Sequence, residues 1–315
     1  MTEPIAQRYR DFAAHETRGL SPLYEELSNG VAADPALLRL LATLPEDRQQ
    51  PNLLLGAVRY VAGLADGYPA FRETVLARWD EIAATMLVRR TQTNEPARCA
   101  ALYPMLAALR QPLALLEVGA SAGLCLYPDR YRYSYGGHPA GDPDSAVVLR
   151  PRVEGAPPRP GPVEVAWRAG IDLNPLDVTD PDDVRWLATL VWPGEDGRLE
   201  RLHAAVDIAR REPPWLVRGD LNERLAEVAA QAPPDATLVV FHTAVLGYID
   251  DAARRAFVDQ VRALPGHWVA QEGAGLVPGV AAAPLPDRPV AYVLSIDACP
   301  VGYSAPHGNW LRWSG

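Results

Sequence analysis

The sequence predicts an α/β protein with a doubly wound, mostly parallel sheet, an all-helical region before it and a β-rich insertion within it. Apolar residues recur at helical spacing through residues 1–110. From residue 113, short apolar runs alternate with amphipathic helical segments, as in a parallel sheet covered by helices. The last two apolar runs have no helix between them, which predicts a terminal antiparallel hairpin. We expect a helical cap or layer over residues 1–110 and the α/β domain over 111–315.

Polar residues mark the expected helix starts in the first region. Ser21 and Asp34 each precede a proline, so each is expected to cap a helix that begins with that proline. Asn94 is expected to cap another helix, which Pro104 kinks or splits. The expected helices cover residues 8–15, 22–30, 35–44, 51–64, 70–90 and 95–109.

The α/β domain shows its strands in order along the chain. The expected strands are residues 113–118, 163–171, 215–220, 236–243, 267–272, 291–297 and 308–313. Helical segments follow most of them, at residues 181–190, 198–211, 223–232 and 251–264. Between the first two strands lies an irregular insertion, about residues 127–162. There we expect residues 131–135 to pair with 147–153 across a turn at 136–144.

The first strand leads into a loop of small residues. Glu117 lies two positions before Gly119, and Gly123 closes the loop. Glycines let the backbone turn sharply and approach a ligand closely. A helix that begins near Ala122 would also turn its free N–H groups toward that ligand. The strand, loop and helix are typical of nucleotide-type cofactor sites, and plain tight packing is the alternative.

Composition narrows the function. The net charge of −9 and the pI of about 5.2 argue against nucleic acid as the main partner. No apolar run is long enough to span a bilayer, and the N-terminus has no secretory signal. Three widely spaced cysteines predict a reducing cytoplasm, with no disulfide framework. Histidine and cysteine spacing supports no metal site.

Five polar or aromatic residues are further site candidates. His242 ends the fourth strand, where it is either a general base or a hydrogen-bonded core histidine. Asn94 is either a helix cap or part of a lid over the substrate. Tyr133 either belongs to a plain strand or lines a pocket, and Tyr248 either packs or meets the substrate. His307 lies in a turn whose chemistry explains its proline and glycine neighbours but not the histidine.

Four segments carry a resemblance to known families: residues 92–99 (QTNEPARC), 115–137 (LLEVGASAGLCLYPDRYRYSYGG), 170–178 (GIDLNPLDV) and 305–313 (APHGNWLRW). Through them nearly the whole chain resembles a bacterial family known as domain of unknown function 2332. Residues 113–313 also resemble class I S-adenosylmethionine-dependent methyltransferases with a Rossmann-like sheet. The shared features are an acid before a small-residue loop, two later strands that end in acids, and a terminal hairpin.

The resemblance implies that S-adenosylmethionine is the cofactor and that these residues hold it: Glu117, Gly119, Ala120, Ser121, Gly123, Asp172 and Asp220. The first acid and the glycines would hold the methionine part, Asp172 the ribose hydroxyls, and Asp220 would lie at the adenine. An ionised carboxylate can accept from both ribose hydroxyls. The chain departs from the family at Ser121, where the usual loop has glycine. Asp172 also follows Glu117 by 55 positions (172 − 117).

We therefore expect a methyltransferase that acts on a small molecule, with His242 as its base and the helices and insertion closing the site. Two other functions remain open. The same fold could serve a non-catalytic binding or scaffold protein, because the loop is imperfect and no distinct catalytic motif follows the fourth strand. A nicotinamide-dependent oxidoreductase is the third, although the loop lacks Gly-x-Gly. The sequence does not set the oligomeric state.

Overall fold

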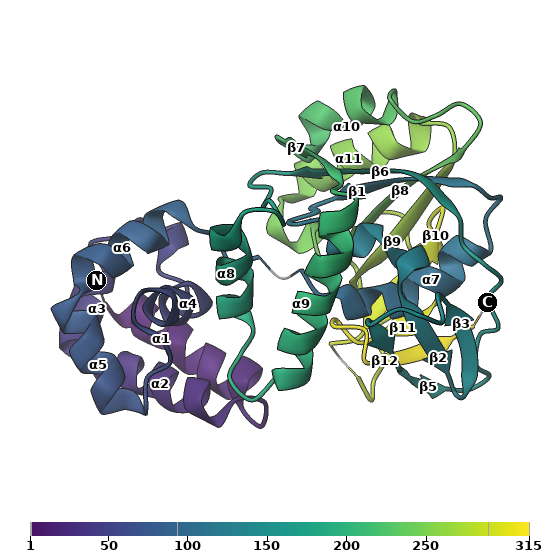
Figure 1. Cartoon of the computed structure of the whole chain (residues 1–315). Helices are drawn as coiled ribbons and strands as arrows, with labels where there is room; N and C mark the ends of the chain where they lie inside the picture. The colour runs from purple at the N-terminus through teal and green to yellow at the C-terminus, as the bar shows by residue number, and fades with distance from the viewer. Residues whose placement is uncertain (1, 93, 289, 315) are drawn as a thin grey trace. The chain divides into compact units, whose positions relative to one another are not determined.

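The computed structural model describes residues 2–92, 94–288 and 290–314 (Figure 1). The chain forms two units, one of residues 1–93 and 180–200, the other of residues 94–179 and 201–315. The helical unit thus ends well before residue 110 and takes in a segment from the middle of the chain. The long helix α9 (Asp196–Arg211) begins in the helical unit and ends in the other.

Several helices of the helical unit begin at a proline, as the sequence predicts. Its helices are α1 (Glu3–Phe12), α2 (Pro22–Ala33), α3 (Pro35–Leu41), α4 (Pro51–Ala62), α5 (Tyr68–Ala77), α6 (Trp79–Val88) and α8 (Pro181–Leu190). Asp34 caps α3 by accepting from the backbone N–H groups of Ala36 (2.7 Å) and Leu37 (3.3 Å). The expected cap at Ser21 is wrong, because its hydroxyl instead donates to the carbonyl of Pro193 at 3.1 Å.

Helix α8 packs with the N-terminal helices through side-chain contacts that the apolar periodicity of the sequence does not predict. Arg89, just after α6, forms ion pairs with Asp182 and Asp183 in the first turn of α8. The indole N–H of Trp186 donates to the carbonyl of Arg90 at 2.9 Å, and Trp186 is fully buried. These contacts explain why residues 180–200 belong with the N-terminal helices.

The second unit is built on a nine-stranded sheet in the order β5-β12-β11-β10-β9-β8-β1-β6-β7. Its parallel part consists of β1 (Leu113–Val118), β6 (Val165–Asp172), β7 (Trp215–Arg218), β8 (Thr237–Thr243) and β9 (His267–Gly273). From the central strand β1 the chain builds outward to β6 and β7, then crosses back and adds β8 and β9 on the other side. The predicted doubly wound, mostly parallel sheet is therefore confirmed.

The end of the chain forms more strands than expected. β10 (Tyr292–Ile296) runs antiparallel to β9 and pairs with β11 (Cys299–Ser304), which pairs antiparallel with β12 (Trp310–Trp313). The expected partner of β10, residues 308–313, is thus wrong, because the unassigned segment of β11 lies between them. A short strand from the insertion, β5 (Arg152–Glu154), completes this edge beside β12.

The insertion forms its own three-stranded sheet of β2 (Arg132–Tyr135), β3 (His138–Gly141) and β4 (Val148–Leu149). β2 turns back into β3 through two glycines, so the segment expected as a long turn is itself a strand. The pairing expected with residues 147–153 exists only as a short parallel contact to β4. The insertion is therefore β-rich as expected, with a different pairing.

The two faces of the main sheet carry different layers. Leu116, Val118 and Val240 belong to a hydrophobic cluster with α10 (Leu221–Ala229) and α11 (Asp251–Ala263), which cover one face (Figure 1). Glu117 alternates with these neighbours in β1 and points to the other face. The helix α7 (Cys99–Ala107) and the insertion pack together, since the Tyr103 and Tyr133 rings lie 4.3 Å apart.

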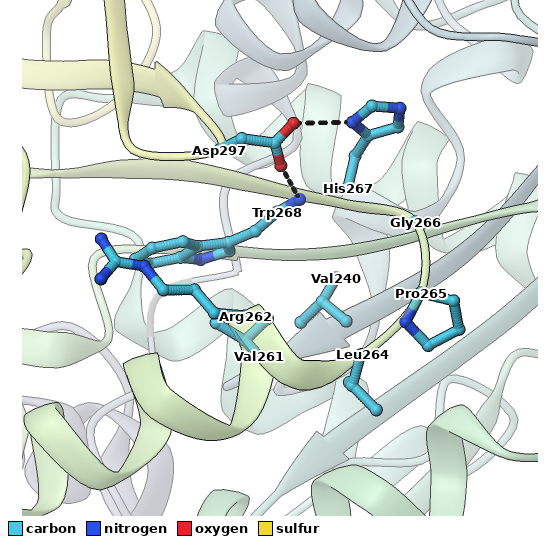
Figure 2. A pocket seen from close by; sticks show the side chains of 9 residues that line it. All are labelled: Val240, Val261, Arg262, Leu264, Pro265, Gly266, His267, Trp268 and Asp297. Atoms are coloured by element: carbon cyan, nitrogen blue, oxygen red, sulfur yellow. Dashed lines mark hydrogen bonds and ion pairs between the residues drawn. The ribbon is translucent and has the colours of Figure 1, made fainter.

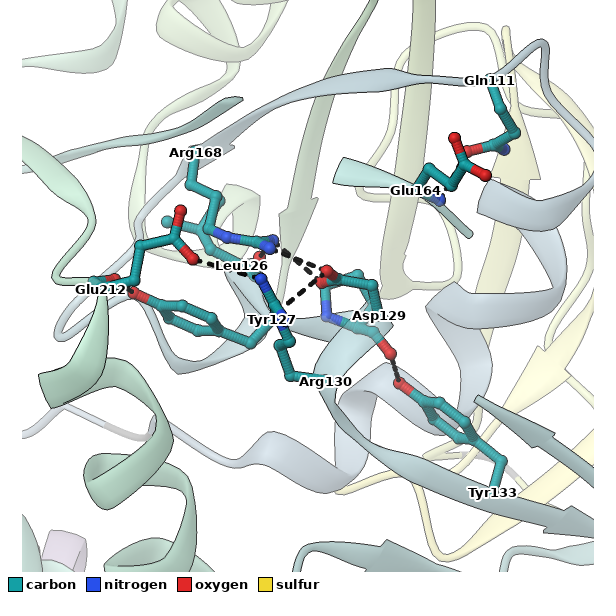
Figure 3. Close-up of polar contacts among 10 residues, drawn as sticks. Gln111, Leu126, Tyr127, Asp129, Arg130, Tyr133, Glu164, Arg168 and Glu212 are labelled. Atoms are coloured by element: carbon teal, nitrogen blue, oxygen red, sulfur yellow. Dashed lines mark hydrogen bonds and ion pairs between the residues drawn. The ribbon is translucent and has the colours of Figure 1, made fainter. Parts of the chain in front are cut away.

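A buried ion pair fastens the insertion to the sheet (Figure 3). Arg168 of β6 donates to both carboxylate oxygens of Asp129, at 2.9 and 2.8 Å, and to the carbonyl of Leu126 at 2.7 Å. Its guanidinium also stacks over the ring of Tyr127, 4.9 Å from the centroid. The side chains of Arg168 and Asp129 are only 5% and 11% exposed. The contact thus holds the chain directly after the glycine loop against β6.

We expect Asp129→Asn to lower the free energy of unfolding by about 3 kcal/mol, because it leaves the buried guanidinium of Arg168 without its counter-charge. Urea denaturation would measure this loss. Arg130→Gln is the matched control: its side chain is 52% exposed, and its ion pairs with Asp129 and Glu212 are both at 3.4 Å. Its change should stay below about 1 kcal/mol. Equal, small losses in both variants would contradict a structural role for the Arg168–Asp129 pair.

Candidate functional site

The candidate site lies where the winding of the sheet reverses, at the carboxyl ends of β1 and β8. β1 pairs in parallel with β6 on one side and with β8 on the other. In open α/β sheets, loops leave these two strands in opposite directions, and ligands bind in the crevice between them. A ligand is therefore expected to bind near the loop after β1 and the segment after β8.

The loop after β1 is braced by β6. Gly119, Ser121 and Gly123 have positive φ angles of 71°, 52° and 71°. The N–H groups of Gly119 and Ala120 donate to the carbonyl of Ile171, at 2.8 and 3.1 Å. A Cβ atom on Gly119 would lie 2.4 Å from the Val245 side chain, so the segment after β8 packs directly on this glycine. The loop is thus held closely from both sides.

The helix expected near Ala122 is wrong. Instead, a single 3-10 turn, Leu124–Leu126, follows the loop, and another, Pro128–Arg130, comes before β2. In place of a helix, the side chain of Asn94 forms hydrogen bonds with the backbone of this loop. Its amide donates to the carbonyl of Ala120 at 3.3 Å and accepts from the N–H of Leu124 at 3.0 Å. The loop is therefore clamped by a residue from the segment before α7.

Asn94 is consequently not the cap of the following helical turn, Pro96–Arg98. That cap is Glu95, whose Oε1 accepts from the N–H of Ala97 at 3.0 Å. The same oxygen accepts from the Nε of Arg201, on α9, at 2.7 Å. Glu95 is 3% exposed, so the ion pair with Arg201 is buried. It anchors residues 94–98, the segment before α7 that we call the clamp segment.

The two later acids lie at neighbouring strand ends. Asp172, the last residue of β6, accepts from the N–H of Ser121 at 2.8 Å and from the N–H of Asn174 at 2.7 Å. Asp220, after β7, caps α10 by accepting from the N–H of Asn222 at 2.7 Å. Both carboxylates are half-buried. The first of them is bonded directly to the glycine loop, although 51 positions separate Ser121 from Asp172.

Glu117 is the unusual group of this edge. It is 2% exposed, and its Oε2 has no hydrogen-bond partner among the residues that the structure describes. Burial raises the pKa of this carboxyl well above its usual value, and the nearby thiol of Cys125 acts in the same direction. The positive charge of Arg98 opposes that rise in the pKa. A buried carboxyl without a donor is costly, and such groups often mark a binding site.

Arg98 was not among the residues that the sequence singled out. It is 7% exposed and joins three separate segments of the chain. Its Nε donates to the carbonyl of Pro306 at 3.0 Å, and its Nη1 donates to the carbonyl and hydroxyl oxygens of Thr243, at 2.9 and 3.2 Å. The only signal in the sequence was its position inside the motif QTNEPARC, where a charged residue follows a proline and an alanine.

His242 lies on the opposite face of the sheet from Glu117. The register pairs Glu117 with Phe241 and Val118 with His242, so one residue separates the two faces. The His242 Nδ1 lies 2.7 Å from the Oε1 of Glu272, and the Trp268 indole N–H donates to Nε2 at 2.9 Å. Because an indole N–H can only donate, the imidazole carries its proton on Nδ1. His242 is fully buried beneath α11, where its ring meets Phe257.

Glu272 links the buried His242 to the segment after β8. Its Oε1 also accepts from the N–H groups of Val245 and Leu246, at 2.8 and 3.1 Å. The chain from Trp268 through His242 to Glu272 therefore fixes the segment after β8, which carries Val245 against Gly119. The predicted role of His242 as a base stays a prediction, and in this structure both ring nitrogens are engaged away from the Glu117 face.

The remaining candidates are dispersed. Tyr133 is fully buried in the insertion, and its hydroxyl donates to the carbonyl of Pro128 at 2.7 Å. Tyr248 is 86% exposed on the turn after β8. His307 is half-buried in the turn before β12, where Gly308 packs against the backbone of Ala97. Only His307 shares the Arg98 neighbourhood, while Tyr133 is a packing residue.

A cavity of about 220 Å³ lies near the amino end of β9, at the opposite end of the strands from the glycine loop (Figure 2). Asp297, in the β10–β11 turn, accepts from the His267 ring at 2.7 Å and from the Trp268 backbone N–H at 2.8 Å. Arg262 lies beside the Trp268 indole. These contacts tie the hairpin to β9, and the cavity is far along the strands from the glycine loop.

In the part of the chain that the structure describes, no cluster of three or more histidine, cysteine, aspartate or glutamate side chains is arranged to bind a metal ion. No helix there has the length and apolar character needed to cross a membrane.

We expect the free energy of unfolding of the wild type to fall, relative to Glu117→Gln, as the pH rises from 5 to 8. The raised pKa means that the folded state favours the protonated carboxyl. This contribution is complete below the pKa of the unfolded chain, about 4.3, and is lost as the pH rises through the folded pKa. Urea denaturation at several pH values measures it. Glu46→Gln, at an exposed glutamate, is the control, and a constant difference between Glu117→Gln and wild type would contradict the buried, unpaired carboxyl.

We expect Gly119→Ala to destabilise the protein more than Gly137→Ala. Both glycines have positive φ, 71° and 93°, so both alanines carry a backbone strain of about 1–2 kcal/mol. Only at Gly119 would the new Cβ also meet Val245, because nothing lies within 4 Å of it at Gly137. Adding Val245→Ala to Gly119→Ala should recover part of the difference in a double-mutant cycle. Equal losses at the two glycines would show that the loop does not pack on Val245.

A comparison with curated proteins finds no match for the chain. A family model described as an uncharacterized protein conserved in bacteria, domain of unknown function 2332, matches residues 6–313. The match includes the clamp segment around Asn94 and Arg98, the glycine loop, Asp172 and the turn at His307. The chain therefore belongs to this bacterial family.

Proposed function

We propose that the protein binds S-adenosylmethionine at the carboxyl ends of β6, β1 and β8 and transfers its methyl group to a small molecule. The observation that carries the proposal is the 2.8 Å hydrogen bond from the Ser121 N–H to Asp172. The insertion folds as a separate sheet, so the second acid lies beside the glycine loop despite the long interval in sequence. The acid pattern expected from the sequence is thereby assembled at one edge.

The residues present fit this cofactor in their donor and acceptor chemistry. A carboxylate can accept about four hydrogen bonds. Asp172 accepts from two backbone N–H groups beside the glycine loop, and an ionised carboxylate is the kind of acceptor that ribose hydroxyls need. Glu117 offers a buried acceptor for an ammonium group. Asp220 lies one strand further along the edge, and we expect it at the adenine end of the cofactor.

The missing helix favours this cofactor over a dinucleotide. A diphosphate is normally bound by the N–H groups at the start of a helix after the glycine loop. Here a 3-10 turn of three residues, Leu124–Leu126, follows the loop, and the N–H of Leu124 donates to Asn94. S-adenosylmethionine has no phosphate and does not need that helix. This observation weighs against the nicotinamide-dependent oxidoreductase.

Bound S-adenosylmethionine would supply a methyl group already activated by the sulfonium. The chain's own part would then be to orient the two reactants and exclude water, which accounts for most of the rate in such transfers. Asn94 and Val245 hold the loop in place from its two sides, and Arg98 ties the turn before β12 over the same edge. A base is needed only for a protonated nucleophile, and His242 is the predicted one.

A second candidate is a non-catalytic binding protein with the same fold. The burial of His242 and the pairing of both its nitrogens favour it, since they leave no histidine on the Glu117 face at the end of β8. Such a protein would bind the cofactor without turnover. Incubation with methyl-labelled S-adenosylmethionine and a pool of bacterial small molecules separates the two: transferred label supports the enzyme, and binding without transfer supports the binding protein.

We expect calorimetric titration to give micromolar binding of S-adenosylmethionine or S-adenosylhomocysteine. Asp172→Asn should weaken it about tenfold or more, because a charge-assisted hydrogen bond to a hydroxyl contributes at least this much. Asp177→Asn is the matched control, since Asp177 follows the same strand and accepts from the N–H and hydroxyl groups of the exposed Thr179. Absence of binding at millimolar ligand, or tighter binding of a nicotinamide cofactor, would overturn the proposal.

A further inference from the structure

Arg98 and Glu117 bring a guanidinium and an ionisable carboxyl to the same side of the sheet edge. Glu117 lies opposite Phe241 in the register, and Thr243 follows two residues later on the same face. Arg98 bonds to Thr243 through its Nη1, which places the guanidinium at the end of β8, beside the end of β1. Both side chains are more than nine-tenths buried.

The two charged groups nevertheless do not form an ion pair with each other. Within the described chain, Glu117 Oε2 has no hydrogen-bond partner, and the hydrogen bonds of Arg98 use only Nε and Nη1. Burial of an unpartnered carboxyl favours its protonated form, and a cation bound beside it would restore the charged form. A buried guanidinium and a buried, unpartnered carboxyl at neighbouring strand ends therefore point to a ligand that carries both a carboxylate and an ammonium group.

The fixed orientation of Arg98 supports this interpretation. Bonds from Nε to Pro306 and from Nη1 to Thr243 set the plane of the guanidinium and leave Nη2 for another acceptor. The clamp segment that carries it is anchored by the buried pair of Glu95 and Arg201. Ser121 adds a further polar atom, since its hydroxyl is buried and, in the described residues, without a partner. Such preorganised donors lower the entropic cost of binding.

We propose that Arg98 and Glu117 together recognise a zwitterionic α-amino-acid group, with Arg98 binding its carboxylate and Glu117 its ammonium. The inference rests on the proposed function, because S-adenosylmethionine ends in such a group. It adds a specific prediction: the amino-acid end of the ligand is selected by a residue from the segment before α7, outside the glycine loop. Arginine suits this role because its fork of N–H groups matches a carboxylate.

The test changes the ligand first and keeps the protein intact. Calorimetric titration of the wild type would compare S-adenosylhomocysteine, its decarboxylated analogue, its deaminated analogue and 5′-methylthioadenosine, which lacks the amino-acid end. Loss of the carboxylate or of the ammonium should each weaken binding about tenfold or more, in proportion to a charge-assisted contact. 5′-Methylthioadenosine should bind weakest of the four.

The protein side of the test uses Arg98→Gln. In this variant the decarboxylated analogue should bind as well as S-adenosylhomocysteine, while the deaminated analogue should still bind more weakly. Arg201→Gln is the matched control: it loosens the same segment through Glu95, and it should keep the discrimination for the carboxylate. Circular dichroism would confirm that both variants fold, and the ligand series stands on its own if Arg98→Gln does not.

The outcomes separate this inference from the proposed function. If 5′-methylthioadenosine binds as tightly as S-adenosylhomocysteine, the cofactor site stands and the zwitterion site is overturned. If Arg98→Gln folds and still discriminates for the carboxylate, Arg98 is not its partner and the inference is likewise overturned. If no adenosyl compound binds at millimolar concentration, both the proposed function and the inference fall.

Discussion

The parallel pairing of β1 with β6 on one side and β8 on the other is the constraint on which the candidate site depends. It brings the carboxyl ends of three strands to one edge, although they come from distant parts of the sequence. It also makes β1 fully buried, so any polar side chain on it must be paired or bound. Glu117 is the polar residue in this position, and its unpartnered oxygen is the clearest departure from a plain core.

Tight packing around the glycine loop explains why its residues are small. Val245 fills the space over Gly119, and the Asn94 amide closes the other side. The loop is therefore rigid for reasons that lie within the protein, and a bound ligand need not account for each glycine. What packing does not explain is the buried guanidinium of Arg98 near the buried, unpartnered carboxyl of Glu117. A ligand at this edge would account for these two groups and for Asp172.

The buried polar side chains at this edge form two sets on opposite faces of the sheet, because they occupy alternate positions along the strands. Glu117 and Thr243 point to the face that meets the clamp segment, whereas His242 and Glu272 point into the core beneath α11. The first pair meets Arg98, and the second forms a closed chain of hydrogen bonds with Trp268. Because side chains alternate along a strand, the adjacent residues His242 and Thr243 point to opposite faces and do not share a site.

The sequence by itself determined the fold class, the helical region, the central strands and the loop, because apolar periodicity and glycine placement are local properties. It also indicated Glu117, Asp172 and Asp220 at strand ends. The tertiary structure alone decided that α8 joins the N-terminal helices, that β11 separates β10 from β12, and that Asn94 clamps the loop while Glu95 caps the turn. It also decided that Arg98 faces Glu117 and that His242 does not. These are contacts between segments far apart in the chain, and they depend on register and on which face a side chain takes, which local periodicity does not encode.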